Sequence, residues 1–207
     1  MMLKKLYKLC VGETFRMRVT MYTRGNKMSE KIVKPKIEDV IIRPMLNDDI
    51  EMILHNYSEQ GWEKPREVIE GYFIKQRNDD AFVFVADYCD NLAGYTILYS
   101  DTNVGPYANN KIPVISDFIV FEKYQRKGIG SKILDAAELK ASQLSDSVQL
   151  AVGLHSGYGA AQRVYAKRGY IPDGSGVWYK ESVLEPYNDC QNDDELILYL
   201  IKSLRTV

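Results

Sequence analysis

The chain has 207 residues, of which 45% are hydrophobic and 27% are charged, and its formal net charge is −1. This composition is typical of a globular protein long enough for one domain with a sizeable core. The balanced charge argues against nucleic-acid binding, and no apolar run approaches the roughly 20 residues that span a bilayer. Three cysteines without CxxC spacing and two histidines argue against a disulfide framework or a metal site, and favour reduced thiols in the cytoplasm.

The first 36 residues differ from the rest because lysine and arginine far outnumber their two acidic residues, Glu13 and Glu30. The segment lacks sustained periodicity and the apolar region of a secretory signal. We expect residues 1–36 to be a flexible basic extension without a catalytic role, followed by one domain over residues 37–207. A locally packed appendage, a basic arm that contacts acidic partners, and a natural translation start at Met28 remain open.

The domain is expected to begin with a strand over Val40–Pro44, which the proline ends. Asn47 or Asp48 is expected to cap the first helix, and Pro65 suits the first turn of a second helix that ends near Gln76.

Two further apolar runs predict a β-hairpin. Ala81–Ala86 and Leu92–Tyr99 read as its strands, and Asp90-Asn91 marks the turn. The long polar connection of residues 100–113 follows, and it contains no recognisable motif.

The stretch after this connection predicts a strand, a loop and a helix in direct succession. Val114–Phe121 is apolar and rich in β-branched and aromatic residues, so a buried strand is expected. Apolar residues recur at helical spacing from Ile129 onward. Between them, Gly128 and Gly130 allow a ligand to approach the first N–H groups of the helix, beside the positive charges of Arg126-Lys127. This combination predicts a site for a phosphate or pyrophosphate.

The pattern of this loop narrows the choice of phosphate site. The Walker pattern is absent, and the dinucleotide pattern Gly-x-Gly-x-x-Gly fails because Ile133 stands in the third place. The remaining pattern, Gln/Arg-x-x-Gly-x-Gly/Ala over Gln125–Gly130, resembles that of the GCN5-related N-acetyltransferases (GNAT). In that family the loop holds the pyrophosphate of acetyl-CoA. A glycine-rich helix cap that binds nothing is the alternative.

A second stretch supports the same resemblance. After a predicted strand over Val148–Leu154, a helix is expected between Tyr158 and a C-capping Gly169. The family carries Asn-x-x-Ala-x-x-Leu-Tyr-x-x-x-Gly-Phe at this place. The residues that match are Ala161, Tyr165, Gly169 and Tyr170, with Val164 standing for the leucine. Tyr158 stands where the family often has asparagine, which puts one contact with the pantetheine arm in doubt.

The resemblance covers residues 37 to the C-terminus and implies the fold. The GNAT fold is α/β (α+β): a mixed, mostly antiparallel twisted sheet of about six to seven strands flanked by about four helices. Gly176–Tyr179 and Leu196–Ile201 would form an antiparallel pair at the end of the chain. Periodicity alone does not separate this last run from a helix.

The resemblance also implies the site residues. Tyr165 would be the general acid that protonates the CoA thiolate, the alternative being a core aromatic residue. Asp117 would be the general base, through water, the alternative being a structural hydrogen-bond acceptor. Asp117 alternates with Phe118 along the strand, so the two are expected on opposite faces. The predicted cofactor-binding residues are Phe118, Ile119, Val120, Gln125, Arg126, Lys127, Gly128, Ile129, Gly130, Ser131 and Tyr158. No metal is implied. The aromatic residues that would line the acceptor cleft are Tyr57, Trp62, Tyr72 and Phe73.

The function implied is an N-acetyltransferase that moves an acetyl group directly from acetyl-CoA to a primary amine of a small molecule or peptide. The alternatives are a non-catalytic acyl-CoA sensor of the same fold, another acyl donor, and O-acylation. The acceptor itself is undetermined: an aminoglycoside, a polyamine, an amino acid and a protein N-terminus all remain open. A cytoplasmic monomer or homodimer without membrane or nucleic-acid partners is expected.

Overall fold

The structure, a computed structural model, describes residues 6–7, 17–19, 31–33 and 40–205. The first three ranges are short strands, β1 (Leu6–Tyr7), β2 (Met17–Val19) and β3 (Lys31–Val33), which form an antiparallel sheet of their own. Most of the predicted basic extension, including Met28, lies outside the described residues. Its flexibility and the domain boundary at residue 37 therefore stay predictions.

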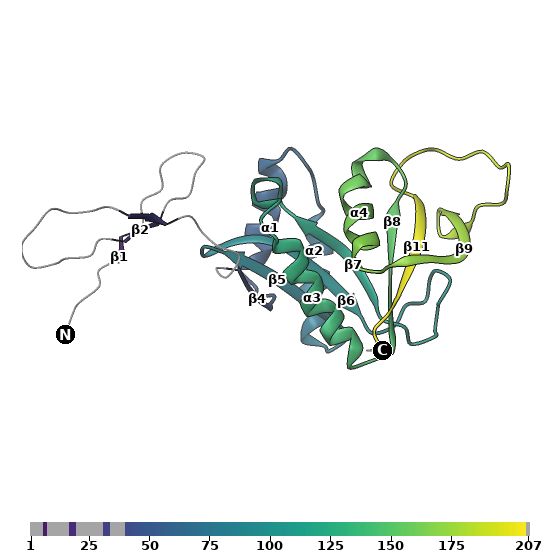
Figure 1. Cartoon of the computed structure of the whole chain (residues 1–207), viewed down its shortest axis with the longest axis horizontal. Helices are drawn as coiled ribbons and strands as arrows, with labels where there is room; N and C mark the ends of the chain where they lie inside the picture. Colours follow the sequence, from purple (N-terminus) through teal and green to yellow (C-terminus); the bar gives the residue numbers. More distant parts are fainter. Residues whose placement is uncertain (1–5, 8–16, 20–30, 34–39, 206–207) are drawn as a thin grey trace, which may run out of the picture.

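The main sheet has eight strands in the order β10-β9-β11-β8-β7-β6-β5-β4 (Figure 1). Its neighbours pair antiparallel except for β7 and β8, which pair parallel. The strands are β4 (Val40–Pro44), β5 (Ala81–Tyr88), β6 (Asn91–Tyr99), β7 (Val114–Val120), β8 (Ser147–Gly153), β9 (Ile171–Tyr179), β10 (Ser182–Val183) and β11 (Leu196–Ser203). The predicted fold class is confirmed. The strand count is higher than predicted because the two-residue β10 extends the sheet beyond β9.

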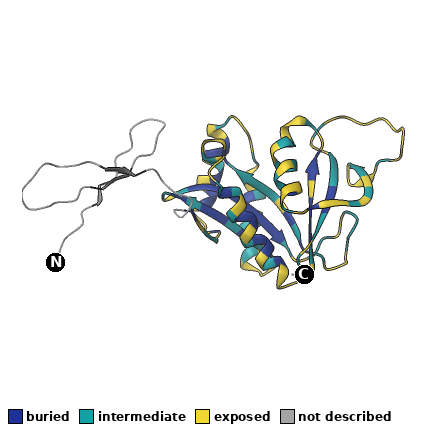
Figure 2. Ribbon diagram, in the orientation of Figure 1, coloured by how far each residue is buried: buried dark blue, intermediate teal, exposed yellow. Residues whose placement is uncertain are grey.

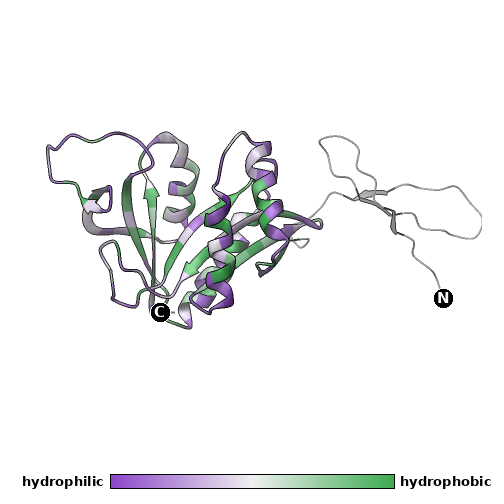
Figure 3. Ribbon diagram, turned by 180° about the vertical axis from the view of Figure 1, so that it is seen from behind, coloured by the Kyte–Doolittle hydropathy of each residue, from purple (hydrophilic) through white to green (hydrophobic). Residues whose placement is uncertain are grey.

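Helices cover both faces of this sheet. α1 (Asp49–Glu59) and α2 (Arg66–Arg77) share one apolar cluster with alternate residues of β5 and β6, among them Val83 and Tyr95. α3 (Ile129–Ser142) and α4 (Gly159–Lys167) pack on the opposite face. The central strands are accordingly buried between exposed helix surfaces (Figure 2), and their apolar residues are concentrated there (Figure 3). The two faces are called below the α1/α2 face and the α3/α4 face.

One local prediction was wrong, and another was right only about the position of the residue. The hairpin turns at Cys89-Asp90 rather than Asp90-Asn91, because the two turn residues adopt φ of 51° and 59°, as a tight two-residue hairpin requires. Asp48 is the N-cap residue of α1 but makes no side-chain cap bond. Asp49 instead accepts the Leu46 N–H at 2.7 Å.

The sheet opens between β7 and β8. These strands are paired only at Val114 with Gln149 and at Ile115 with Leu150. Beyond these pairs they diverge, as Figure 1 shows. The expectation that β7 is buried throughout is therefore corrected: Ile115 is buried, but the following residues have no β8 neighbour and are partly exposed. Their backbone is available along one edge to another extended molecule.

A β-bulge interrupts β7 at the same place. Tyr95 of β6 is in register with Ile119, whereas Ile97 is in register with Ser116, so β7 carries one extra residue. Asp117 lies in this bulge with a φ of 46°, in the left-handed region that aspartate and asparagine tolerate better than most residues. The bulge directs the Asp117 carboxylate toward Tyr95, on the α1/α2 face.

A charged network on the α3/α4 face ties α3 to α4 and β11. Glu138 of α3 is 8% exposed and accepts two hydrogen bonds from Arg168 at 2.8 Å and one from Lys202 at 2.6 Å. Burial raises the pKa of Glu138, but the bonds from Arg168 and Lys202 outweigh it and leave the pKa below its ordinary value.

We expect Glu138→Ala to lower the free energy of unfolding by about 2 kcal/mol, because two cations lose a partly buried partner. Chemical denaturation at pH 7 measures the change. The matched control is Asp135→Ala, whose 65% exposed carboxylate also binds Arg168 and should contribute less than about 1 kcal/mol. A depressed pKa means that the stabilisation is present at neutral pH and lost in acid, below about pH 4.3. Equal effects of the two substitutions would contradict this assignment.

Candidate active site

The predicted phosphate loop connects β7 to α3. A 3-10 turn over Glu122–Tyr124 follows the strand. The side-chain amide of Gln125 then donates to the Val120 carbonyl at 3.0 Å and closes the loop against the strand. Gly128 has a φ of 78° and precedes the first residue of α3, Ile129. Among the described residues, the N–H groups of residues 129–131 have no hydrogen-bond acceptor. The loop thus offers the unpaired donors that an anion needs.

Position 130 leaves little room for a side chain because the loop lies close to the strand. A Cβ built on Gly130 would lie 3.0 Å from the Phe118 ring and 3.4 Å from Val120. Phe118 and Val120 therefore face the loop on the α3/α4 face, whereas Ile119 packs against the core of the opposite face. Of the predicted cofactor-binding residues on β7, Phe118 and Val120 have side chains next to the loop, whereas Ile119 pairs with Tyr95 of β6.

The two basic residues of the loop differ in surroundings. Lys127 donates to the Lys123 carbonyl at 2.6 Å, and its ammonium lies 5.4 Å from the centre of the Tyr124 ring. Arg126 is exposed and has a φ of 58°. Both keep positive charge beside the free N–H groups at the start of α3.

Tyr165 of α4 is 5% exposed and lies beside β7. Its ring centre is 6.1 Å from that of Phe118 and 5.8 Å from that of Tyr170. Burial, and then the neighbouring Tyr158, raises the pKa of Tyr165 above its ordinary value. The phenol therefore stays protonated at neutral pH and is able to donate a proton.

Tyr158 lies across the opening, on the β8 side. Its hydroxyl donates to Asp194 at 3.0 Å, and His155 Nε2 lies 2.9 Å from the same oxygen. His155 Nδ1 accepts the Gly157 N–H, so Nε2 is the nitrogen that carries the proton in the neutral ring. Burial, the bond to Asp194 and more distant charges including Asp117 raise the pKa of Tyr158 to about 12. Tyr158 thus lies within electrostatic range of both predicted catalytic residues.

Asp117 is the centre of a polar cluster on the α1/α2 face. Its Oδ2 accepts the Tyr95 hydroxyl at 2.7 Å and lies 2.9 Å from Lys64 Nζ. The Tyr95 hydroxyl in turn lies 2.9 Å from that of Tyr57. The side chains of Lys64 and Asp117 are 22% and 19% exposed, so the ion pair is open to solvent on one side.

More tyrosines surround this carboxylate. Burial first, and the charge of Asp117 second, raises the pKa of each of Tyr57, Tyr72, Tyr95 and Tyr99. We name the group formed by Lys64, Asp117 and these tyrosines the carboxylate cluster. Around Lys64 it combines one carboxylate with aromatic rings, and this combination suits a cation.

Sequence reasoning found this cluster only in part. Tyr57 and Tyr72 were expected at the acceptor cleft and lie near Asp117, as described above. Trp62 is 47% exposed and its ring centre lies 6.4 Å from that of Tyr57, whereas Phe73 packs in the core. Lys64 and Tyr95 were missed: Lys64 belongs to no motif, although period-2 alternation along β6 signals which tyrosines share a face.

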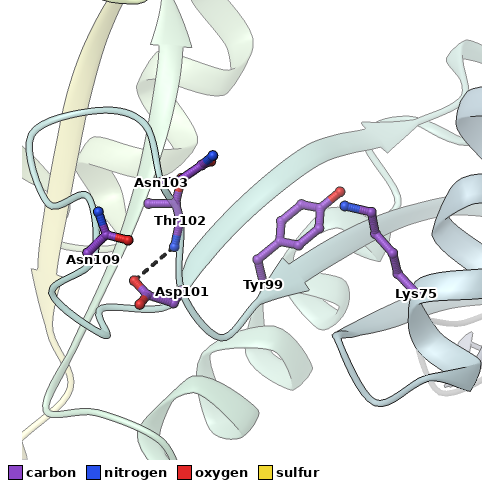
Figure 4. Close-up of a pocket in the computed structure, with 6 residues that line it drawn as sticks. All are labelled: Lys75, Tyr99, Asp101, Thr102, Asn103 and Asn109. Carbon is purple, nitrogen blue, oxygen red and sulfur yellow. Dashed lines mark hydrogen bonds between the residues drawn. The ribbon is translucent and has the colours of Figure 1, made fainter.

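A hollow of about 430 Å³ adjoins the cluster at Tyr99 (Figure 4). It is lined by Lys75, Tyr99, Asp101, Thr102, Asn103 and Asn109. The Lys75 ammonium lies 4.9 Å from the centre of the Tyr99 ring, and Asp101 accepts the Thr102 N–H at 2.9 Å. This hollow is polar and opens beside the connection of residues 100–113.

The described residues contain no group of three or more metal-ligating side chains. No described helix has both the length and the apolarity needed to cross a membrane.

Comparison with known proteins identifies the family. No curated protein matches the sequence. Among solved structures, the chain is similar to Ard1 from Thermoplasma volcanium, with 18% identity, a TM-score of 0.59, and 81% of this chain and 99% of that one covered. It is similar to the ribosomal-protein-S18-alanine N-acetyltransferase from Escherichia coli, with 12% identity, a TM-score of 0.57 and coverages of 81% and 96%. It is also similar to a GNAT family acetyltransferase from Elizabethkingia anophelis with acetyl-CoA bound, with 18% identity, a TM-score of 0.52, and 80% of this chain and 99% of that one covered.

These identities are low, so the solved structures show a shared fold. The family is shown by the sequence itself. Residues 53–184, more than half of the chain, match the family described as "Acetyltransferase (GNAT) domain". The matched range contains the glycine loop, the bulged strand and the helix of Tyr165. The chain therefore belongs to the GNAT acetyltransferase family.

Proposed function

We propose that the protein transfers the acetyl group of acetyl-CoA directly to a primary amine. The donor half of the site supports this proposal through the unpaired N–H groups of residues 129–131 and the unpaired edge of β7. The pyrophosphate binds at the former, and the pantetheine arm lies along the latter. The structural likeness to a GNAT enzyme with acetyl-CoA bound agrees with this arrangement.

The ion pair between Lys64 and Asp117 is the observation that supports a primary amine as the acceptor. A lysine ammonium lies 2.9 Å from this carboxylate on the face opposite the glycine loop, next to the part of β7 proposed to hold the thioester. The cluster therefore already binds a primary ammonium ion. An acceptor amine binds in the same way, and the hollow at Tyr99 accommodates the part of the acceptor beyond the amine.

The proposed reaction assigns one role to each group. A backbone N–H near Ile119 or Val120 polarises the thioester carbonyl. Asp117 positions the amine and removes its proton, directly or through water, because only the neutral amine attacks. Tyr165, on the other face, gives its proton to the departing CoA thiolate. The bulge places the Asp117 carboxylate on the α1/α2 face and the Phe118 side chain on the α3/α4 face, so acceptor and donor approach the same point from two sides.

The test is release of free thiol from acetyl-CoA by the full-length protein with a panel of polyamines, aminoglycosides, amino acids and peptides. For the best acceptor, we expect Asp117→Asn to lower kcat/KM by roughly 10²-fold, with unchanged affinity for CoA. Asparagine tolerates the positive φ of the bulge, so the backbone is retained. The exposed Asp135→Asn is the matched control and should leave the rate unchanged.

Two outcomes would contradict the proposal. Tight CoA binding without thiol release for any amine would favour the sensor of acyl-CoA over the enzyme. If the Asp117→Asn protein has the wild-type kcat/KM, Asp117 takes no part in the reaction.

A further inference from the structure

Lys64 occupies the place that the proposed function gives to the acceptor. Its Nζ is 2.9 Å from Asp117 Oδ2, and the next residue along the chain, Phe118, belongs to the proposed cofactor edge. Asp117 and Phe118 are consecutive residues of β7, so Lys64 contacts a side chain of the same strand that is proposed to hold the thioester.

The segment that carries Lys64 is held in this position. Between α1 and α2, the Trp62 N–H donates to the Tyr57 carbonyl at 3.0 Å, and the Gln60 side chain accepts the Glu122 N–H at 3.2 Å. An ion pair between Lys123 and Glu59 adds a second link to the start of the glycine loop. The connection is thereby fixed over β7, with Lys64 directed at the bulge.

Stability alone does not account for this ion pair. Ion pairs that are partly exposed to solvent contribute little to the free energy of unfolding. Asp117 also already accepts a hydrogen bond from Tyr95. The chemistry of the position is more informative: a primary amine lies on the proposed base, opposite the proposed acid Tyr165.

We propose that the protein acetylates its own Lys64, an inference that rests on the proposed function. The deprotonated Nζ attacks the carbonyl carbon of acetyl-CoA, the C–N bond forms and the C–S bond breaks. The ammonium loses two protons: one replaces the proton that Tyr165 gives to the thiolate, and one goes to solvent. The products are acetyl-Lys64 and free CoA, and no further reactant is needed.

The modification changes the charge of the carboxylate cluster. The amide formed on Lys64 is neutral, so the ion pair with Asp117 is lost. Asp117 then faces the opening without a resident cation and is available for the ammonium group of an external acceptor.

The experiment incubates the full-length protein with acetyl-CoA and no added amine, and follows each lysine by peptide mass spectrometry. Lys202 is the matched control because it is 21% exposed and pairs with Glu138 at 2.6 Å, but belongs to the α3 network. We expect Lys64 to gain one acetyl group at least about tenfold faster than Lys202, because its amine is held beside the proposed thioester position. The rate constant should not depend on protein concentration, and Tyr165→Phe should slow labelling of Lys64 alone.

Equal labelling of Lys64 and Lys202, or a Lys64 rate unchanged in Tyr165→Phe, would overturn the inference. Lys64→Arg, which keeps a cation beside Asp117, should abolish the fast labelling without affecting CoA binding. Two parallel measurements, calorimetry with CoA and thiol release with the amine panel, distinguish self-acetylation from the proposed function. If external amines are acetylated and Lys64 is not, self-acetylation fails while the proposed function stands. If acetyl-CoA does not bind, both fail.

Discussion

Replacing Tyr165 by phenylalanine is expected to lower the rate of acetyl transfer by roughly 10²–10⁴-fold. The substitution removes the hydroxyl and keeps the ring, which packs between Phe118 and Tyr170. Without the proposed donor, the thiolate would have to leave unprotonated or take its proton from water. Stability and CoA affinity should change little, since no described residue is hydrogen-bonded to this hydroxyl.

Single-turnover thiol release with the best acceptor measures this effect. Tyr170→Phe, which removes a hydroxyl from the same aromatic group, is the matched control and should leave the rate unchanged. Burial holds the pKa of Tyr165 above its ordinary value of about 10, so the difference from wild type should be constant from about pH 6 to pH 9. A folded phenylalanine variant with the wild-type rate over this range would show that Tyr165 is a packing residue.

Gly130→Glu is expected to weaken CoA binding on the order of a hundredfold, about 2.7 kcal/mol. A Cβ at this position already lies 3.0 Å from the Phe118 ring, so the longer side chain is forced into the loop. Its carboxylate then lies beside the N–H groups proposed to bind the pyrophosphate, where negative charge repels negative charge.

Calorimetric titration with CoA gives the affinity, and a thermal melt shows whether the variant is folded. Leu139→Glu introduces the same charge on the same helix at a site 66% exposed and further from the loop, so it controls for net charge. Gly130→Ala separates bulk from charge and should have an intermediate affinity. If Gly130→Glu and Gly130→Ala both bind CoA as tightly as wild type, the loop is not the pyrophosphate site.

The parts of the site that the sequence predicts are those encoded by neighbouring residues. The glycine loop follows a strand and opens a helix within Gln125–Gly130, so backbone sterics and charge identify it locally. The helix of Tyr165 is recognisable for the same reason. Hairpin and helix positions were also predictable from apolar periodicity, although the turn moved by one residue to Cys89-Asp90.

The carboxylate cluster could not be read from the sequence because its members come from separate elements. Lys64 follows α1, Tyr95 lies in β6 and Asp117 in β7, and only the folded sheet brings them together. The divergence of β7 from β8 is equally non-local. An apolar strand such as Val114–Phe121 predicts burial, but its exposure depends on where its neighbour's pairing stops.

The extra residue in β7 also bears on how such a site can vary. Without it, simple alternation from the buried Ile115 would place residue 117 on the α3/α4 face and residue 118 on the α1/α2 face. With it, Asp117 lies on the proposed acceptor side, while Phe118 and Val120 lie on the proposed donor side. Substitution at this one position is therefore expected to alter which acceptor is recognised without disturbing the residues proposed to hold acetyl-CoA. The bulge thus allows the proposed acceptor half of the site to change independently of the proposed donor half.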